Sequence, residues 1–274
     1  MNFKRIELIF LLTFLAIDIF LFGMVRQNQN MQTENVSQNN SNATIIKEMR
    51  NDQIKVGDLS DINQTAYYVA GTKNNLLREK MGQLTNQQTS FVDNKLRSNF
   101  NEPIDISAKS PQKTISKMLT DSTFVLYGTE YHYNSELSSS HQLVYAQTAM
   151  GRDIYTPKGQ LIFNLNSDHQ LIGYTQQYLT DIKSLREQSE TISEQRAVIW
   201  LYQYNEIPNN TKIAWSKLGY TKLIDIDNNV VMIPTWVIAI KYNSSTIQIK
   251  RINAFTGSLI KSSTASNVKE TVND

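Results

Sequence analysis

The sequence contains no cysteine, and this absence excludes disulfide bonds, thiolate nucleophiles and thiolate metal ligands. Any part of the chain that lies outside the cell must therefore be held together by a hydrophobic core without covalent crosslinks. A chain of 274 residues is long enough to bury such a core in one or two lobes.

The sequence also lacks a large excess of charge of either sign. The 27 lysine and arginine residues nearly balance the 25 aspartate and glutamate residues, which leaves a formal net charge of +2. No run of basic residues forms a strip that could follow a phosphate backbone. The ten glycines are isolated, as turn glycines are, so the sequence has no glycine-rich phosphate loop. Nucleic acid is therefore not expected as a partner.

Residues suited to catalysis or metal binding are few. The three histidines, His132, His141 and His169, show neither HExxH nor H-x-H spacing. The segment 138–141 (SSSH) places hydroxyls beside an imidazole but lacks the strand-turn-helix elbow of a hydrolase, so its pattern favours a polar hairpin loop. The pair at 225 and 227 (DID) fits either a turn or a paired acid site. We expect no enzyme activity, metal, cofactor or small-molecule substrate.

The longest apolar run, residues 6–25 (IELIFLLTFLAIDIFLFGMV), predicts a transmembrane anchor. About 20 apolar residues at a rise of about 1.5 Å each can cross a hydrocarbon core of roughly 30 Å. Lys4 and Arg5 precede the run. Because basic flanks favour the cytoplasm, residues 1–5 are expected inside and the rest of the chain outside, in a single-pass arrangement in the cell membrane.

A cleavable signal peptide is the alternative interpretation of this run. Its apolar region would be about 7–15 residues long and would end in a small-x-small cleavage site. Residues 22–26 (FGMVR) offer no such site. The length of the run and the missing site favour an uncleaved signal anchor.

Two acidic residues interrupt the apolar run. Glu7 is expected in the inner headgroup region, whereas Asp18 lies deeper. Leu11, Phe14, Asp18 and Leu21 have the alternating spacing of three and four residues that is typical of a helix packed against a neighbour. Asp18 is either a contact with another membrane helix or a tolerated neutral acid. We predict this transmembrane stripe as the partner-binding site.

Composition divides the chain beyond the anchor into four segments. Residues 26–42 are rich in Asn and Gln and predict a polar tether. Residues 43–184 are predicted as an extracytoplasmic N-terminal lobe and residues 185–264 as a C-terminal lobe, with a boundary in the polar stretch 181–190. Residues 265–274 are predicted as a polar tail.

In the first lobe the pattern predicts several helices and then an antiparallel meander. Helices are expected at 43–52, at 87–100 and after Ser110-Pro111, where a hydroxyl cap precedes a proline. Segments with the composition and spacing of strands lie at 65–70, 124–133, 142–149, 154–155, 160–165 and 170–178.

The order of helix and then strands recurs in the second lobe. Residues 191–194 (TISE) fit a capping box with Thr191 as the cap, opening a helix that runs to about Glu206. Strands are expected at 212–215, 221–226, 230–242 and 246–255. The sequence therefore predicts an α+β protein with two lobes, each a helix on an antiparallel sheet.

Several segments resemble the YycI family, also called WalI. They are the anchor core 15–21 (LAIDIFL) and the stretches 173–179 (GYTQQYL), 218–220 (LGY), 233–236 (IPTW) and 253–257 (NAFTG). The resemblance spans essentially the whole chain and depends on the order of these segments. The last segment is also similar to the end of PepSY-type modules, in which a helix precedes strands that close in such a turn.

The resemblance implies a regulator rather than a catalyst. Family members are single-pass proteins of Gram-positive bacteria. With the related YycH, they associate with the sensor histidine kinase of a cell-wall two-component system, called WalK or YycG. The polar stripe on the anchor agrees with this role because it supplies a surface for another membrane helix.

Two other functions remain open from the sequence. An extracellular ligand-binding or peptidase-inhibiting module of PepSY type would have a groove lined by Trp200, Trp215 or Trp236, although such residues are more often part of the core. A wall hydrolase would depend on His141.

Overall fold

The computed structural model describes residues 10–22, 35–106, 110–242, 246–261 and 267–269. The chain forms two compact units, Met1–Glu48 and Met49–Asp274. In the first unit, residues 10–22 are helical and exposed. A second helix, α2 (Asn35–Asn51), contains most of the helix predicted at 43–52 and also the last eight residues, 35–42, of the segment expected to be a tether. Helix propagation costs little once a nucleus exists, which allows α2 to extend into polar residues.

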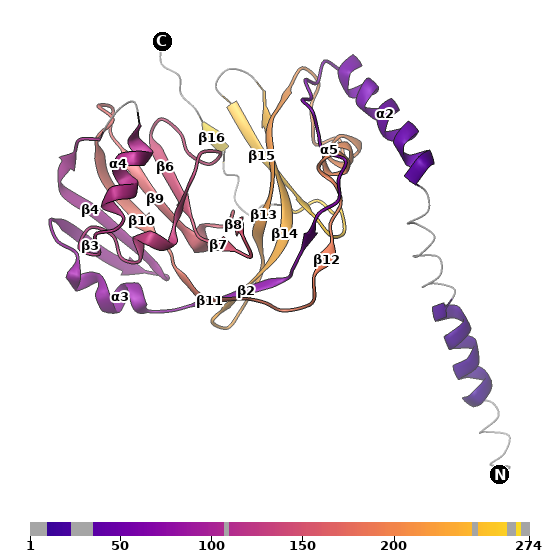
Figure 1. The fold of residues 1–274 in the computed structure, drawn as a ribbon, viewed down its shortest axis with the longest axis horizontal. Coiled ribbons are helices and arrows are strands. Elements are labelled where there is room, and N and C mark those ends of the chain that lie inside the picture. The colour runs from indigo at the N-terminus through magenta and orange to yellow at the C-terminus, as the bar shows by residue number, and fades with distance from the viewer. Residues whose placement is uncertain (1–9, 23–34, 107–109, 243–245, 262–266, 270–274) are drawn as a thin grey trace. The chain divides into compact units, whose positions relative to one another are not determined.

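A six-stranded antiparallel sheet occupies one part of the second unit (Figure 1). From edge to edge its strands are β3 (Gln87–Val92), β4 (Lys95–Ile104), β10 (Leu171–Gln176), β9 (Gln160–Leu165), β6 (Gln142–Ala146) and β5 (His132–Asn134). The short helices α3 (Leu76–Lys80) and α4 (Pro111–Met118) belong to this part. The predicted strands at 160–165 and 170–178 are confirmed as β9 and β10, whereas the segment predicted at 142–149 is divided into β6 and a separate short strand at Thr148–Ala149.

The second sheet is built around one long strand, β14 (Asn229–Lys241). The strand β13 (Lys212–Ile226) pairs along one edge of β14. On the other edge, β14 pairs first with β2 (Val69–Lys73) and then with β15 (Thr246–Asn253). Pro234 lies between these two partners, at the position where no strand needs its missing N–H. The strands β11 (Leu179–Ser184) and β16 (Asn267–Lys269) complete the sheet.

The remaining strands form two short pairs, β1 (Thr65–Ala66) with β12 (Ser189–Glu190) and β7 (Thr148–Ala149) with β8 (Arg152–Asp153). Short 3₁₀ turns lie at Met81–Gln83, Gly128–Glu130 and Pro157–Gly159. The named strands of the described chain all pair antiparallel with one another, which confirms the predicted α+β class.

The chain passes from the second sheet to the first and back. It leaves β2 at Lys73 and returns at Leu179 of β11, and these two residues are directly paired. The Asn74 side chain joins the two passages, because its Nδ2 donates to the carbonyl of Thr72 at 3.4 Å and to that of Tyr178 at 3.3 Å. Two strands from within the predicted first lobe therefore belong to the second sheet, and the boundary at 184/185 stays a prediction.

The helix predicted at 87–100 is wrong. This segment forms a hairpin of β3 and β4, with Phe91 paired to Leu96. Asp93 and Asn94 both have positive φ, 52° and 57°, as the two central residues of a type I′ turn require. Phe91, Leu96 and Phe100 fit a helical stripe as well as a hairpin, and the turn residues decide the outcome.

The strand predicted at 124–133 is largely wrong. Residues 124–130 form turns and a 3₁₀ helix, and only His132–Asn134 pair as a strand. Tyr127 has φ 51°, which a strand cannot accommodate. In the second sheet, the strands predicted at 212–215 and 221–226 are one continuous strand, β13.

Helix α4 begins at Pro111 after Ser110, as predicted, although the Ser110 side chain makes no capping hydrogen bond. Helix α5 (Glu194–Gln203) begins two residues later than the predicted capping box implies. Its cap is Ser193, whose hydroxyl accepts from the Arg196 N–H at 3.2 Å. Thr191 instead donates to the carbonyl of Gln64. The hydroxyl nearest the first helical turn supplies the cap.

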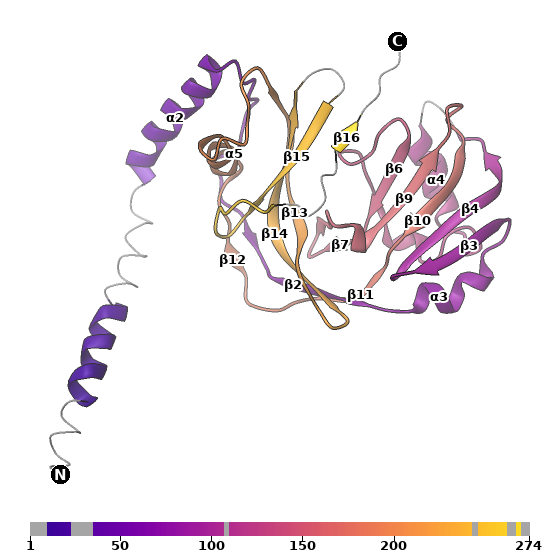
Figure 2. The ribbon, with the colours of Figure 1, turned by 180° about the vertical axis from the view of Figure 1, so that it is seen from behind.

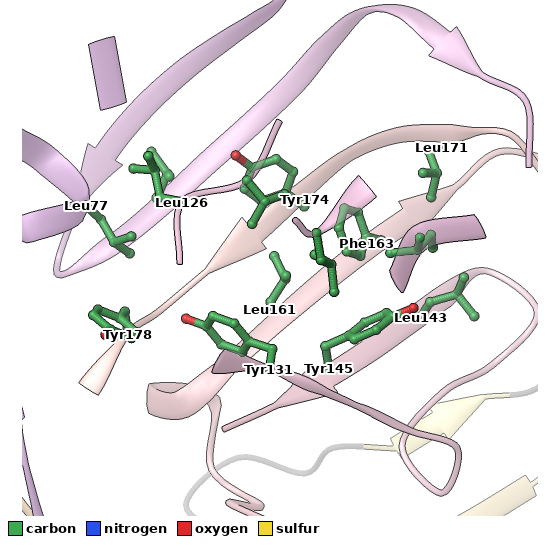
Figure 3. Packing of buried hydrophobic residues seen from close by; sticks show 14 of the residues in the cluster. Leu77, Leu126, Tyr131, Leu143, Tyr145, Leu161, Phe163, Leu171, Tyr174 and Tyr178 are labelled. Atoms are coloured by element: carbon green, nitrogen blue, oxygen red, sulfur yellow. The ribbon is translucent and has the colours of Figure 1, made fainter. Parts of the chain in front are cut away.

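The largest core lies over the first sheet (Figure 3). Leu161 and Phe163 alternate along β9 and are fully buried, as period-two burial of one sheet face requires. Tyr145 lies edge-on to Phe163, with ring centroids 5.8 Å apart.

Helix α5 packs against β13 and β14 and lies beside the second sheet in both views (Figures 1 and 2).

In the part of the chain that the structure describes, no helix is both long and apolar enough to cross a membrane. The anchor predicted at residues 6–25 has its two ends, 6–9 and 23–25, outside the described residues. The prediction of an anchor is therefore not tested by the fold.

Candidate interaction surfaces

The predicted stripe lies on the described helix at residues 10–22. Leu11, Phe14, Asp18 and Leu21 are all exposed there. At about 100° per residue, offsets of 0, 3, 7 and 10 place the four side chains on one face of the helix. The described helix thus has the geometry that the stripe needs, and its partner stays a prediction.

The histidines and their neighbouring serines are parts of turns and exposed strands. Ser138 Oγ donates to the carbonyl of Asn134 and accepts from the Val144 N–H. Ser140 Oγ lies 2.8 Å from His141 Nδ1 at an exposed position. Within the described residues, no group of three or more His, Asp or Glu side chains could hold a metal ion. This arrangement matches the polar hairpin loop predicted from the sequence.

The other acidic and aromatic candidates have structural partners. Asp225 pairs with Lys222 at 2.9 Å and with Lys73 at 3.7 Å, and Asp227 occupies a turn with φ 51°. Trp236 is 3 % exposed and donates from Nε1 to the carbonyl of Ile192, so it cannot line an open groove.

The segment 173–179 connects the first core to the passage between the sheets. A Cβ on Gly173 would lie 2.2 Å from the carbonyl oxygen of Ser98, so only glycine permits this approach of β4. Gln176 Nε2 donates to the carbonyl of Leu126 at 2.6 Å. The backbone of Leu179 is held by both ends of the Gln147 amide, each at 2.9 Å.

The segment 218–220 forms the contact with β8 and the residues that follow it. A Cβ on Gly219 would lie 2.4 Å from the Tyr155 ring, so the ring packs on bare backbone. The Tyr155 N–H donates to the carbonyl of Tyr220 at 2.7 Å. Tyr220 is fully buried. This segment therefore joins the last residues before β9 to the edge of the second sheet.

The segment 253–257 closes the chain against α5. Asn253 Oδ1 accepts from the Phe255 N–H at 2.9 Å, and the Gly257 N–H donates to the Asn253 carbonyl at 2.8 Å. Gly257 has φ +69°, and a Cβ there would fall within the Trp200 ring. The segments 173–179, 218–220 and 253–257 thus contain packing and turn residues.

A polar cluster lies where β5, β8 and β13 approach one another. Asn134 Nδ2 donates to Asp153 Oδ2 at 2.7 Å, and Lys217 pairs with Glu136 at 3.5 Å. Burial raises the pKa of the Asp153 carboxyl. Burial likewise raises the pKa of Tyr155 to about 12. These contacts join residues 134–136 to β8 and β13.

A groove of about 710 Å³ opens at one end of the first sheet, where β4 passes the loop after α4. Its lining consists of Thr85, Asn86, Phe100, Asn101, Glu102, Pro103, Ile104, Asp105, Asp121, Thr123 and Phe124. The sequence analysis missed this site because its residues come from separate parts of the chain.

Comparison with known proteins identifies one family. The model of the YycI protein family matches residues 32–255. No curated protein matches the chain. Among solved structures, the chain is similar to an uncharacterized protein from Eubacterium rectale ATCC 33656, at 8% identity and a TM-score of 0.44, over 76% of this chain and 90% of that one.

Proposed function

Because the chain belongs to the YycI family, we propose that it is a membrane-anchored extracytoplasmic regulator of two-component signalling. In this proposal it associates with a sensor histidine kinase of the WalK (YycG) type and with a YycH partner. The observation that carries the proposal is the family match, which extends over most of the chain.

The stripe of the described N-terminal helix supports an association within the membrane. Leu11 and Phe14 are 63% and 62% exposed, and Asp18 lies on the same face of the helix. A carboxylate inside a bilayer costs at least about 2–3 kcal/mol, so it usually faces a partner helix or a wet cavity. We therefore assign Asp18 to the contact with a membrane helix of the kinase or of YycH.

Regulation requires that the protein bind one signalling state of the kinase better than the other. A difference of about 1–3 kcal/mol in binding free energy changes the ratio of the two states by roughly 5-fold to 150-fold. The turn and packing roles of the outer segments fit a protein that acts by docking. Whether the kinase is activated or restrained depends on which of its two signalling states the protein binds better.

The Asp18→Leu substitution tests the stripe. It removes the polar group that needs a partner, so association with the kinase or with YycH in a membrane two-hybrid assay should fall several-fold. Ile19→Leu, on a different face of the same helix, is the matched control and should leave the signal unchanged. Membrane fractionation of both variants checks that they are still inserted.

Unchanged association of the Asp18→Leu variant would remove Asp18 from the mechanism. Recovery of the wild-type protein in the culture medium, cut near residue 26, would instead show a cleaved signal peptide and end the anchored-regulator proposal.

The second candidate is a PepSY-type binding module. The order of α5, β13, β14 and β15, closed by the turn at 253–257 against Trp200, favours it. In this case the full-length protein would bind peptide or glycan while the kinase and YycH gave no two-hybrid signal. The same assay, paired with a direct binding measurement, separates the two functions.

A further inference from the structure

The wall of the groove at the end of the first sheet is an irregular stretch of β4. Between the pairs Asn99–Gly173 and Ile104–Leu171, the chain advances five residues along β4 but two along β10. The neighbouring strand β3 begins at the pair Gln87–Phe100, and the Asn101 N–H donates to the carbonyl of Asn86 just before it at 3.0 Å. Residues 101–103 have no Cα partner on β3 or β10, so β4 carries a bulge here.

Two aromatic rings form the floor of the groove. Phe100 and Phe124 are stacked, with centroids 5.2 Å apart and planes 8° from parallel. Both rings are partly exposed although they pack against the main core. Tyr174 fixes the floor from below, since its hydroxyl donates to the carbonyl of Phe124 at 3.2 Å. Phe124 also stacks on the buried Phe163, with centroids 6.0 Å apart, so the floor is a preformed apolar surface of which only parts of the two rings are exposed.

The rim of the groove is acidic. Its described lining contains Glu102, Asp105 and Asp121 and no lysine, arginine or histidine. Asp121 Oδ1 accepts from both the N–H and the hydroxyl of Thr123, at 2.8 and 2.7 Å. The hydrogen bond from the hydroxyl, and then that from the N–H, lower the pKa of the Asp121 carboxyl and keep it ionised. Asp105 Oδ1 accepts from Gln170 Nε2 at 2.8 Å.

We propose that this groove binds an extended segment of a partner protein through a lysine or arginine side chain. The aliphatic stem would lie on the Phe100–Phe124 floor, and the cationic head would meet the carboxylates of the rim. Arginine suits the site best, because its planar guanidinium stacks on rings and bonds carboxylates in pairs. The groove volume falls within the range of about 300–1,000 Å³ that is usual for binding pockets.

Charge complementarity selects this occupant. An anionic lipid surface or an acidic peptide would be repelled by three carboxylates that have no cation among the described lining residues. The site is distinct from the stripe at residues 11–21, so the proposal holds whether or not that stripe binds a kinase. If the groove does not bind a cationic segment, the proposal for the stripe still stands, and the reverse also holds.

The test measures binding of a labelled peptide to the full-length protein in detergent by fluorescence anisotropy. The probe is the peptide Gly-Val-Arg-Val-Arg-Gly, and the comparison peptide carries glutamate in place of both arginines. The triple substitution Glu102→Gln, Asp105→Asn and Asp121→Asn should weaken binding of the arginine peptide at least tenfold. The matched control, Asp58→Asn, Asp61→Asn and Glu187→Gln, removes the same charge from exposed sites outside the groove and should change affinity less than twofold.

A second variant tests the floor. Phe124→Leu keeps an apolar side chain and the backbone carbonyl that Tyr174 uses, but removes the aromatic face, so affinity should fall several-fold. Urea unfolding curves show whether each variant is folded. Equal effects of the two triple variants, equal binding of the glutamate peptide, or unchanged binding to Phe124→Leu would each overturn the proposal.

Discussion

At the scale of single residues, Gly151 and Gly257 are the described glycines with a positive φ. Gly257 combines two restrictions, a positive φ of +69° and a Trp200 ring in the space that a Cβ would occupy. Gly151 has the first restriction alone, since its φ is +77° and nothing lies within 4 Å of its Cβ position. The two positions therefore separate backbone strain from steric overlap.

Gly151→Ala should destabilise the protein by about 1–2 kcal/mol, the cost of a left-handed conformation for a residue with a Cβ. Gly257→Ala should cost roughly 1–3 kcal/mol more, because the Trp200 ring must also move. Urea unfolding of the two variants measures both values. Equal losses at the two sites would mean that Trp200 moves aside freely.

At the scale of elements, the β3–β4 hairpin shows what decides between a helix and two strands. Its turn residues, Asp93 and Asn94, both adopt the left-handed conformation. Asparagine and aspartate tolerate that conformation better than other residues with side chains, and glycine tolerates it best. The hairpin also supplies β4, whose far end forms the groove.

Asn94→Gly should raise the free energy of unfolding by up to about 1 kcal/mol, because Asp-Gly is a preferred type I′ pair. Asn94→Ala should lower it by a similar amount. Gln177 contacts the backbone carbonyl of Asn94, so neither change removes that hydrogen bond. Thermal and urea unfolding check the order of the three proteins. A higher free energy of unfolding for Asn94→Ala, as a helical position would give, would contradict the hairpin.

The sequence predicted helices and strands well where a single hydrophobic period dominated the segment. The strand β9 was predicted with its observed ends, and Ser110-Pro111 marked the start of α4. It failed at 87–100 because the apolar positions fit two periods, and only the turn residues distinguish them. The capping box at 191–194 failed because two hydroxyls compete within three residues and tertiary contacts determine which one caps the helix.

At the scale of the whole molecule, the buried tyrosines link stability to alkaline pH. Burial raises the pKa of Tyr145 and of Tyr155 to about 12, against 10.0 for a free tyrosine. In the unfolded chain both hydroxyls ionise near pH 10, whereas in the folded protein they keep their protons. The folded state therefore binds more protons between pH 10 and 12, and stability falls as the pH rises through this window.

The Tyr155→Phe variant should lose less stability than the wild type between pH 9 and pH 11. Urea midpoints at several pH values measure the difference. Parallel profiles for the wild type and the variant would show that Tyr155 ionises in the folded state as readily as in the unfolded chain.

The groove lay beyond prediction from sequence for a reason that applies to the whole fold. Phe100 and Phe124 are 24 positions apart, and the bulge that follows Phe100 arises from the register of β4 against β10, a pairing of distant strands. Composition marked these residues as apolar or acidic but could not bring them together. The stripe at Leu11, Phe14, Asp18 and Leu21 could be proposed from the sequence because helical spacing alone defines it, and its binding role stays a prediction.

The paired residues Lys73 and Leu179, with Asn74 bridging the two passages, have a mechanical implication. Residues 74–178 form an insert whose two ends leave the second sheet at neighbouring positions of β2 and β11. The insert is joined to the second sheet by two neighbouring passages, and its residues 154 and 155 also contact Tyr220 of β13, so it cannot rotate about a single linker. Twisting it would strain both tethers together, and a pull on either passage would load the β2–β11 ladder in shear.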